Sequence, residues 1–159
     1  MGGREETRFH AIMRGYNEVP ANASQARGRT TLTVGRDDAT INFAIEYSDL
    51  SGPPTVAHVH FGARATNGGV TFFFCGGGGK PACPTGTSGT ISGTVQAADV
   101  LGPVGQGIDP GALPEVLRAI RRGVTYSNIH SAKYPAGEIR GQIFEGRRGD
   151  DERDDFNAF

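Results

Sequence analysis

Apolar and polar residues alternate along most of the chain, which is the pattern of a β-strand that buries one face and exposes the other. The alternation begins at Phe9 and is clearest from Ile41 to Tyr47, where every second residue is apolar. The residues 35–38, Gly-Arg-Asp-Asp, precede this segment and have the composition of a hairpin turn. We expect strands around residues 9–13, 32–34, 41–47, 55–61, 70–75, 89–95, 124–130 and 138–144.

One segment has the period of an α-helix instead. Its apolar residues are spaced at i, i+3, i+4 and i+7, as Leu113, Val116, Leu117 and Ile120. Pro114 near its start and Gly123 just after its end are typical of helix boundaries. The pattern predicts one short amphipathic helix in a late connection.

Composition supports an all-β fold. The chain has 159 residues, a length that suits one domain, and its 25 glycines and 9 prolines are typical of short strands joined by tight turns. We expect a Greek-key-like β-sandwich or barrel of about eight strands with one short helix. The domain should span residues 8–145, after an N-terminal tail of residues 1–7. Residues 146–159 form a charged tail, which should be flexible unless a partner binds Phe156 and Phe159.

The charge balance argues against several classes of partner. Lysine and arginine together number 16 against 17 acidic residues, so a net charge near -1 gives no general reason to bind nucleic acid or anionic membranes. No stretch approaches the roughly 20 apolar residues of a membrane span. The N-terminus also lacks the apolar core of a secretory signal.

The two cysteines favour an oxidising compartment. Cys75 and Cys83 enclose a glycine-rich loop that can bring the two sulfurs together, and such a bridge would contribute roughly 2.5 kcal/mol. Free thiols or two ligands of a metal site are the alternatives, although no second cysteine pair completes a zinc tetrad. A disulfide would indicate a secreted or periplasmic protein.

Histidines form the best candidate site. His58 and His60 flank Val59 in a predicted strand, so their side chains lie on one face, about 7 Å apart at the Cα atoms. Neutral imidazoles are ligands for copper, zinc, iron and nickel. His130 ends another predicted strand, on the same face as Asn128, and would bring a third ligand if that strand pairs with the first or lies opposite it. The alternative is that these histidines face solvent or bind neighbouring side chains.

The fourth histidine, His10, lies on a strand far away in sequence. We expect it at the surface, with a role as a fourth ligand left open.

A second polar group lies near the C-terminal end. Glu138, Arg140 and Gln142 share one face of a predicted strand, and Glu18 offers a further acid that could pair with Arg140. We interpret these residues as a structural network, within which Glu138 could also orient a ligand histidine. The sequence contains no Ser-His-Asp order, phosphate-binding glycine loop or paired-carboxylate motif.

Several of these segments together resemble the CHRD (chordin-repeat) domain. The matching landmarks are FHAIMRGYNEVP at residues 9–20, AHVHFG at 57–62, YSNIH at 126–130 and YPAGEIRGQ at 134–142. The resemblance covers roughly residues 8–144 and implies a β-rich extracellular domain of the stand-alone secreted type. The positions of His58, His60 and His130 match landmarks of the family's motif, whereas His10 does not.

The resemblance also suggests other functions. Chordin is associated with the binding of growth factors, but a stand-alone domain need not share that role. A looser similarity to copper-zinc superoxide dismutases rests on the His-x-His pair and a late histidine. The bridging histidine and the zinc ligands of that family have no evident counterpart in this sequence.

Three functional hypotheses follow. The first is a secreted or periplasmic protein that binds one transition metal, copper rather than zinc or iron, through His58, His60 and His130. The second is a metal-free structural or adhesion module with an extracellular protein partner. The third is a copper-dependent oxidoreductase, the one enzymatic interpretation, which requires an open coordination position at the metal.

Overall fold

A computed structural model describes residues 6–146, which form an all-β domain with one α-helix. The expected fold class is therefore confirmed. The charged tail predicted for residues 146–159 lies, from residue 147 onward, outside the described residues. The strands are β1 (Thr7–Arg14), β2 (Arg27–Val34), β3 (Ile41–Ser48), β4 (Pro54–Phe61), β5 (Gly69–Cys75), β6 (Gly89–Val95), β7 (Thr125–Ser131), β8 (Ile139–Gln142) and β9 (Phe144–Glu145).

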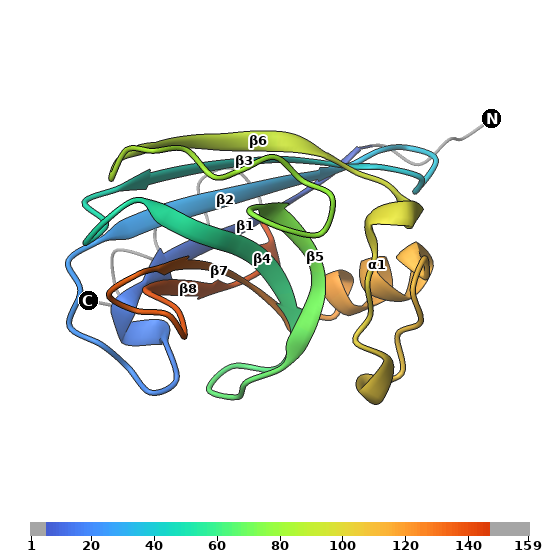
Figure 1. Ribbon diagram of the computed structural model, residues 1–159. Coiled ribbons are helices and arrows are strands. Elements are labelled where there is room, and N and C mark those ends of the chain that lie inside the picture. The colour runs from blue at the N-terminus through green and yellow to red at the C-terminus, as the bar shows by residue number, and fades with distance from the viewer. Residues whose placement is uncertain (1–5, 147–159) are drawn as a thin grey trace.

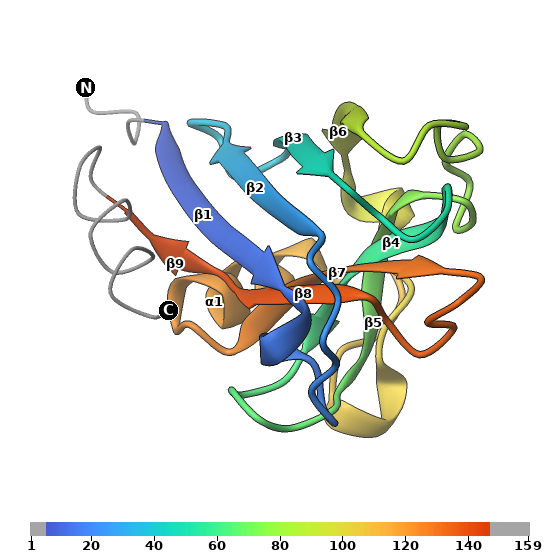
Figure 2. The ribbon, with the colours of Figure 1, turned by 90° about the vertical axis from the view of Figure 1, so that its left-hand side faces the viewer.

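All strand pairs are antiparallel, and the sheet order is β5-β4-β7-β8-β1-β2-β3-β6, with β9 paired to β1. The sheet curls into a nearly closed barrel. In Figure 1 the strands β6, β3, β2 and β1 form the upper layer, β7 and β8 run below them, and β4 and β5 cross in front. Figure 2 shows the same barrel after a quarter turn, with β1 and β2 side by side.

The predicted strand at 138–144 is in fact two strands. β8 pairs with β7 and reaches β1 at Arg14, whereas β9 pairs with β1 alone. Ile143, between them, is fully buried, and its N–H donates to the carbonyl of Thr125. The chain changes its pairing partner at this residue, so the sheet has nine strands where about eight were expected.

The alternation seen in the sequence builds the core. On β1, for example, Phe9, Ala11 and Met13 are at most 2% exposed, whereas the residues between them are not buried. The largest fully buried side chains on the strands are Phe9, Met13, Leu32, Ile41, Ile45, Phe72, Phe74, Ile129 and Ile139.

The helix α1 (Leu113–Arg121) closes one end of the barrel (Figure 1). It buries Leu113, Val116, Leu117 and Ile120, as the spacing predicts. Gly123 follows the helix with a φ of 72°, a left-handed conformation that glycine adopts without strain. Short 3-10 turns occur at Gly15–Asn17, Ala97–Asp99 and Val104–Gln106. Within residues 6–146 no helix is long and apolar enough to cross a membrane.

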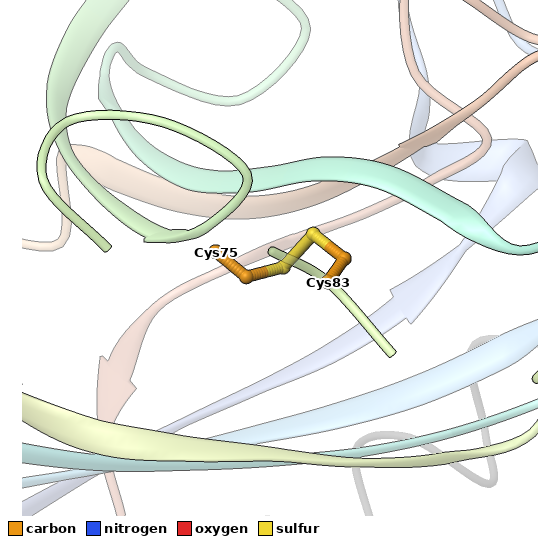
Figure 3. Close-up of a disulfide and its surroundings, with 2 residues drawn as sticks. All are labelled: Cys75 and Cys83. Carbon is orange, nitrogen blue, oxygen red and sulfur yellow. A yellow bond between two sulfur atoms is a disulfide. The ribbon is translucent and has the colours of Figure 1, made fainter. Parts of the chain in front are cut away.

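The predicted disulfide is present. Cys75, at the end of β5, is bonded to Cys83 in the loop that leads toward β6 (Figure 3). The bridge closes a loop in which Gly76 has a φ of 82° and lies so close to Thr55 that a Cβ would stand 2.4 Å from its carbonyl oxygen. Glycine is therefore required at the turn beside the bridge.

Candidate metal centre

The pairing of β4 with β7 brings three histidines together. His58 lies directly opposite Asn128, and His130 lies opposite Val56. The intervening residues Ala57 and Ile129 are fully buried in the core, so the histidines occupy the outer face of the sheet, as the alternation predicts. One potential ligand nitrogen from each of His58, His60 and His130 lies within 4.8 Å of the other two.

This outer face is covered by loops and aromatic side chains. His58 is only 6% exposed, and His60 and His130 are partly buried. The ring of Phe73, from β5, meets the ring of His58 edge-on at 4.9 Å. On the other side, the ring of Tyr126 stacks on His60 with 4.7 Å between centroids. His58 is thereby shielded from bulk water, whereas His60 and His130 are shielded in part.

His130 is held in a tautomer that leaves one nitrogen free. Its Nδ1 lies 2.8 Å from the carbonyl oxygen of Pro135, and since a carbonyl only accepts, Nδ1 carries the proton. In the neutral ring, Nε2 then carries a lone pair. That atom is buried and has no hydrogen-bond partner among the described residues. An imidazole fixed in this way by a carbonyl is the usual arrangement of a histidine that binds a metal.

His58 also has an unpartnered nitrogen. Its Nδ1 is buried without a hydrogen-bond partner anywhere in residues 6–146. Unsatisfied buried polar atoms are rare, and each costs about 1–3 kcal/mol. The rings of His58 and His130, each with one such nitrogen, have their centroids 4.7 Å apart.

His60 differs, because both of its nitrogens face oxygen atoms. Nδ1 lies 2.8 Å from the carbonyl of Gly68, and Nε2 lies 3.0 Å from Oδ1 of Asn128. The orientation of the Asn128 amide is fixed, since its nitrogen donates to Oε2 of Glu18 and to the carbonyl of Ile139. Two acceptors require two N–H groups, so this geometry calls for a doubly protonated His60.

Burial opposes that charge. Removal from water lowers the pKa of His60, although its hydrogen bonds to Gly68 and Asn128 partly restore it. Loss of the Nε2 proton leaves a lone pair facing Oδ1 of Asn128. A metal ion at Nε2 would replace this proton and relieve the contact between two acceptors. The site therefore has two free nitrogens and a third that becomes available when His60 leaves Asn128.

The other two histidines are also favoured in the neutral form. Burial, followed by the nearby His60 and His130, lowers the pKa of His58 to about 3. Burial likewise lowers the pKa of His130, against the effect of its bond to Pro135. Neutral imidazole is the form that binds metals.

Arg140 and Gln142 hold the loop that covers His60. The guanidinium of Arg140 lies over the ring of Tyr126, 3.5 Å from its centroid, and donates to the carbonyls of Ala63 and Thr66. Gln142 donates to the carbonyl of Gly62. These bonds hold the loop of residues 62–68, and the carbonyl of Gly68 at its end accepts from His60. Arg140 thus acts on the site through the loop.

Glu18 belongs to the same network of hydrogen bonds. Its carboxylate is 8% exposed and accepts from Asn128, but no ion pair with Arg140 is formed within 4.0 Å among the described groups. Burial raises the pKa of Glu18 to about 7, and the charge of Arg140 and the bond from Asn128 only partly offset it.

Glu138 and His10 lie outside the histidine cluster. Glu138 is fully buried, and its carboxylate accepts from Ser24, Ser51 and Ser131, so it has a structural role and, among the described residues, makes no hydrogen bond to a histidine. His10, on β1, has its Nδ1 3.4 Å from Oγ1 of Thr31 and takes no part in the cluster.

The comparisons with known proteins give one match. The family model described as the CHRD domain matches residues 9–143, which is most of the chain and contains all three clustered histidines. No curated protein and no solved structure matches the chain.

Proposed function

The chain belongs to the CHRD-domain family, and we propose that it is an extracytoplasmic member of that family that binds one transition-metal ion, copper in preference, through His58, His60 and His130. The observation that carries the proposal is the pair of buried nitrogens, Nδ1 of His58 and Nε2 of His130, that have no hydrogen-bond partner in the described part of the chain. One nitrogen from each of the two rings and one from His60 lie within 4.8 Å of one another, which offers a three-nitrogen donor set.

The surroundings of the rings fit this role. Pro135 and Gly68 each offer a backbone carbonyl to the Nδ1 of a histidine, which directs Nε2 of His130 and of His60 as potential ligands. Burial favours the neutral form of the rings, and Phe73 and Tyr126 pack against His58 and His60. The chain's own residues would thus orient the ligands before any ion arrives.

The donor set favours copper. The cluster contains imidazole nitrogens alone, with no carboxylate or thiolate among its potential ligands. Copper(II) stands highest in the order of divalent-metal affinities for such sites, and a carboxylate is typical of iron sites. A bound copper ion would supply one-electron redox chemistry or serve as cargo for storage and delivery.

The disulfide supports the proposed location. Cys75 and Cys83 are paired, and structural disulfides persist in oxidising compartments such as the periplasm or the exterior of the cell.

Metal analysis of untagged protein, followed by copper and zinc titration, tests the proposal. We expect about one copper ion per chain and an affinity that falls at least roughly tenfold in each of His58→Ala, His60→Ala and His130→Ala. His10→Ala is the matched control and should bind as the wild type does, because His10 lies outside the cluster. Equal binding by all four variants, or no tight binding by the wild type, would refute the proposed site.

A further inference from the structure

Three arginines lie in one row across neighbouring strands. Arg14 on β1 is directly opposite Arg140 on β8 and, on its other side, directly opposite Arg27 on β2. Directly opposed side chains lie on the same face of a sheet, where like charges destabilise the pairing. Figure 2 shows β1 beside β2, with β8 meeting the end of β1. The strand register thus gathers three arginines on one face of the sheet.

Hollows follow this row. One of about 230 Å³ is lined in part by Tyr16, Arg64 and Arg140. The next, of about 300 Å³, shares Tyr16 with the first and adds Arg14 and Arg27.

A third hollow, of about 350 Å³, shares Arg14 and Arg27 with the second and adds Arg29. We name the three together the arginine groove. Neighbouring hollows share lining residues, so the three adjoin one another along the row of arginines.

The charge of the groove is locally positive. Its lining includes the five arginines named above and two acidic residues, Glu18 and Glu46, although the whole chain has a net charge of -1. Arg27 is exposed, whereas Arg140 is buried and contributes its positive charge beneath the surface of the groove. Such a concentration of one sign on an otherwise balanced protein attracts polyanions to that face.

Tyr16 adds a second kind of contact. It is 70% exposed and lines both the first and the second hollow. An exposed aromatic ring between cationic hollows offers a flat apolar surface, on which the apolar face of a sugar ring can pack.

We propose that the arginine groove binds an acidic polysaccharide, a linear chain of sugars that carry carboxylate or sulfate groups. Arginine forms bidentate hydrogen bonds with both groups. A succession of hollows suits a linear polymer, and the disulfide favours a compartment in which acidic polysaccharides rather than nucleic acids are encountered. The inference does not depend on metal binding at the histidines.

Binding of the full-length protein to polygalacturonate, dextran sulfate and uncharged dextran tests the proposal. We expect binding to at least one of the two acidic polymers, none to dextran, and weakening as salt is added. Arg14→Ala/Arg27→Ala should weaken binding by roughly tenfold or more, and Arg27→Lys should retain part of it.

The matched control removes two arginines from elsewhere on the surface. Arg36→Ala/Arg118→Ala changes the net charge equally, and we expect binding within about twofold of the wild type. Circular dichroism of both double variants shows whether each is folded, and if Arg14→Ala/Arg27→Ala is not, the exposed Arg27→Ala variant replaces it.

Several results would overturn the proposal. Failure to bind either acidic polymer would do so, as would an equal loss in both double variants. Tighter binding of duplex DNA than of either polysaccharide would assign the groove to nucleic acid. The acidic residues 150–155 are another possible occupant. Binding seen only in a full-length variant with Asp150, Asp151, Asp154 and Asp155 changed to Asn would assign the groove to that segment.

Discussion

The amide oxygen of Asn128 lies 3.0 Å from Nε2 of His60, and this contact determines whether that nitrogen carries a proton. The amide nitrogen of the same side chain is committed to Glu18 and to the carbonyl of Ile139, so Asn128 can only accept from His60. A proton must therefore occupy Nε2 while the contact lasts. Metal binding at Nε2 of His60 and the bond to Asn128 exclude one another, so His60 must leave Asn128 before this nitrogen can bind an ion.

Copper affinity should depend on pH in a way set by burial. Burial lowers the pKa of His58 to about 3 and also lowers those of His60 and His130. Protons therefore compete with the metal only at pH values below the ordinary histidine pKa of about 6.5. We expect affinity to be nearly constant from pH 8 to 6.5 and to fall as the pH drops further. Chelator-buffered copper titrations measure this, and a steep fall between pH 8 and 7 would contradict it.

Glu18→Gln should change the pH dependence of stability. The pKa of Glu18 in the folded protein, about 7, is raised above its ordinary value of 4.5. Below pH 4.5 the carboxyl group is neutral in both states. Between pH 4.5 and 7 it is ionised in the unfolded state alone, so the free energy of unfolding falls as the pH rises to 7 and is constant above that. Over that interval the variant should gain up to about 3 kcal/mol relative to the wild type.

Urea unfolding at several pH values measures the difference between the two proteins. Glu46→Gln is the control, since Glu46 is exposed on β3, and its difference from the wild type should stay flat. If the difference in the free energy of unfolding between Glu18→Gln and the wild type is also independent of pH, burial does not raise the pKa of Glu18 in the folded protein.

Glu138→Gln should destabilise the fold without affecting the metal site. Burial alone would raise the pKa of Glu138, but the hydrogen bonds from Ser24, Ser131 and Ser51 outweigh it and lower the pKa. The amide replaces one acceptor oxygen by a donor group that faces the serines. We expect a loss of about 2–4 kcal/mol in the free energy of unfolding, from the charged hydrogen bonds and the unsatisfied group together. Copper affinity of the folded variant should stay within about twofold of the wild type, because Glu138 makes no hydrogen bond to the three histidines themselves among the described residues.

Reduction of the disulfide should lower stability by roughly 2.5 kcal/mol, the value for a short closed loop. The comparison is between the oxidised wild type and Cys75→Ala/Cys83→Ala in chemical unfolding, with the midpoint and slope reported separately. An unchanged midpoint would show that the glycine-rich loop is already ordered without the bridge.

The face of each strand was readable from the sequence, whereas the surroundings of the histidines were not. Alternation alone places His58 and His60 on one side and buries Val59, because side-chain direction is a local property of a strand. The carbonyls that hold His60 and His130 belong to Gly68 and Pro135, in loops whose paths depend on tertiary contacts. No periodic pattern marks such atoms.

The change of partner at Ile143 escaped prediction for a similar reason. The alternation of residues 138–144 looks continuous, and only the three-dimensional path shows β8 against β7 and β9 against β1. The partners of Glu138 could not be identified from the sequence either, because Ser24 and Ser51 lie far from it along the chain. Arginines 14, 27 and 140 likewise form a row only through strand register.

The central claim is that the three clustered histidines bind one copper ion, and electron paramagnetic resonance of the copper(II)-loaded protein tests it most directly. The account predicts about one copper(II) per chain with nitrogen hyperfine structure from imidazole ligands, which changes in His130→Ala and stays the same in His10→Ala. A spectrum without nitrogen ligands, or one identical in wild type and His130→Ala, would contradict it.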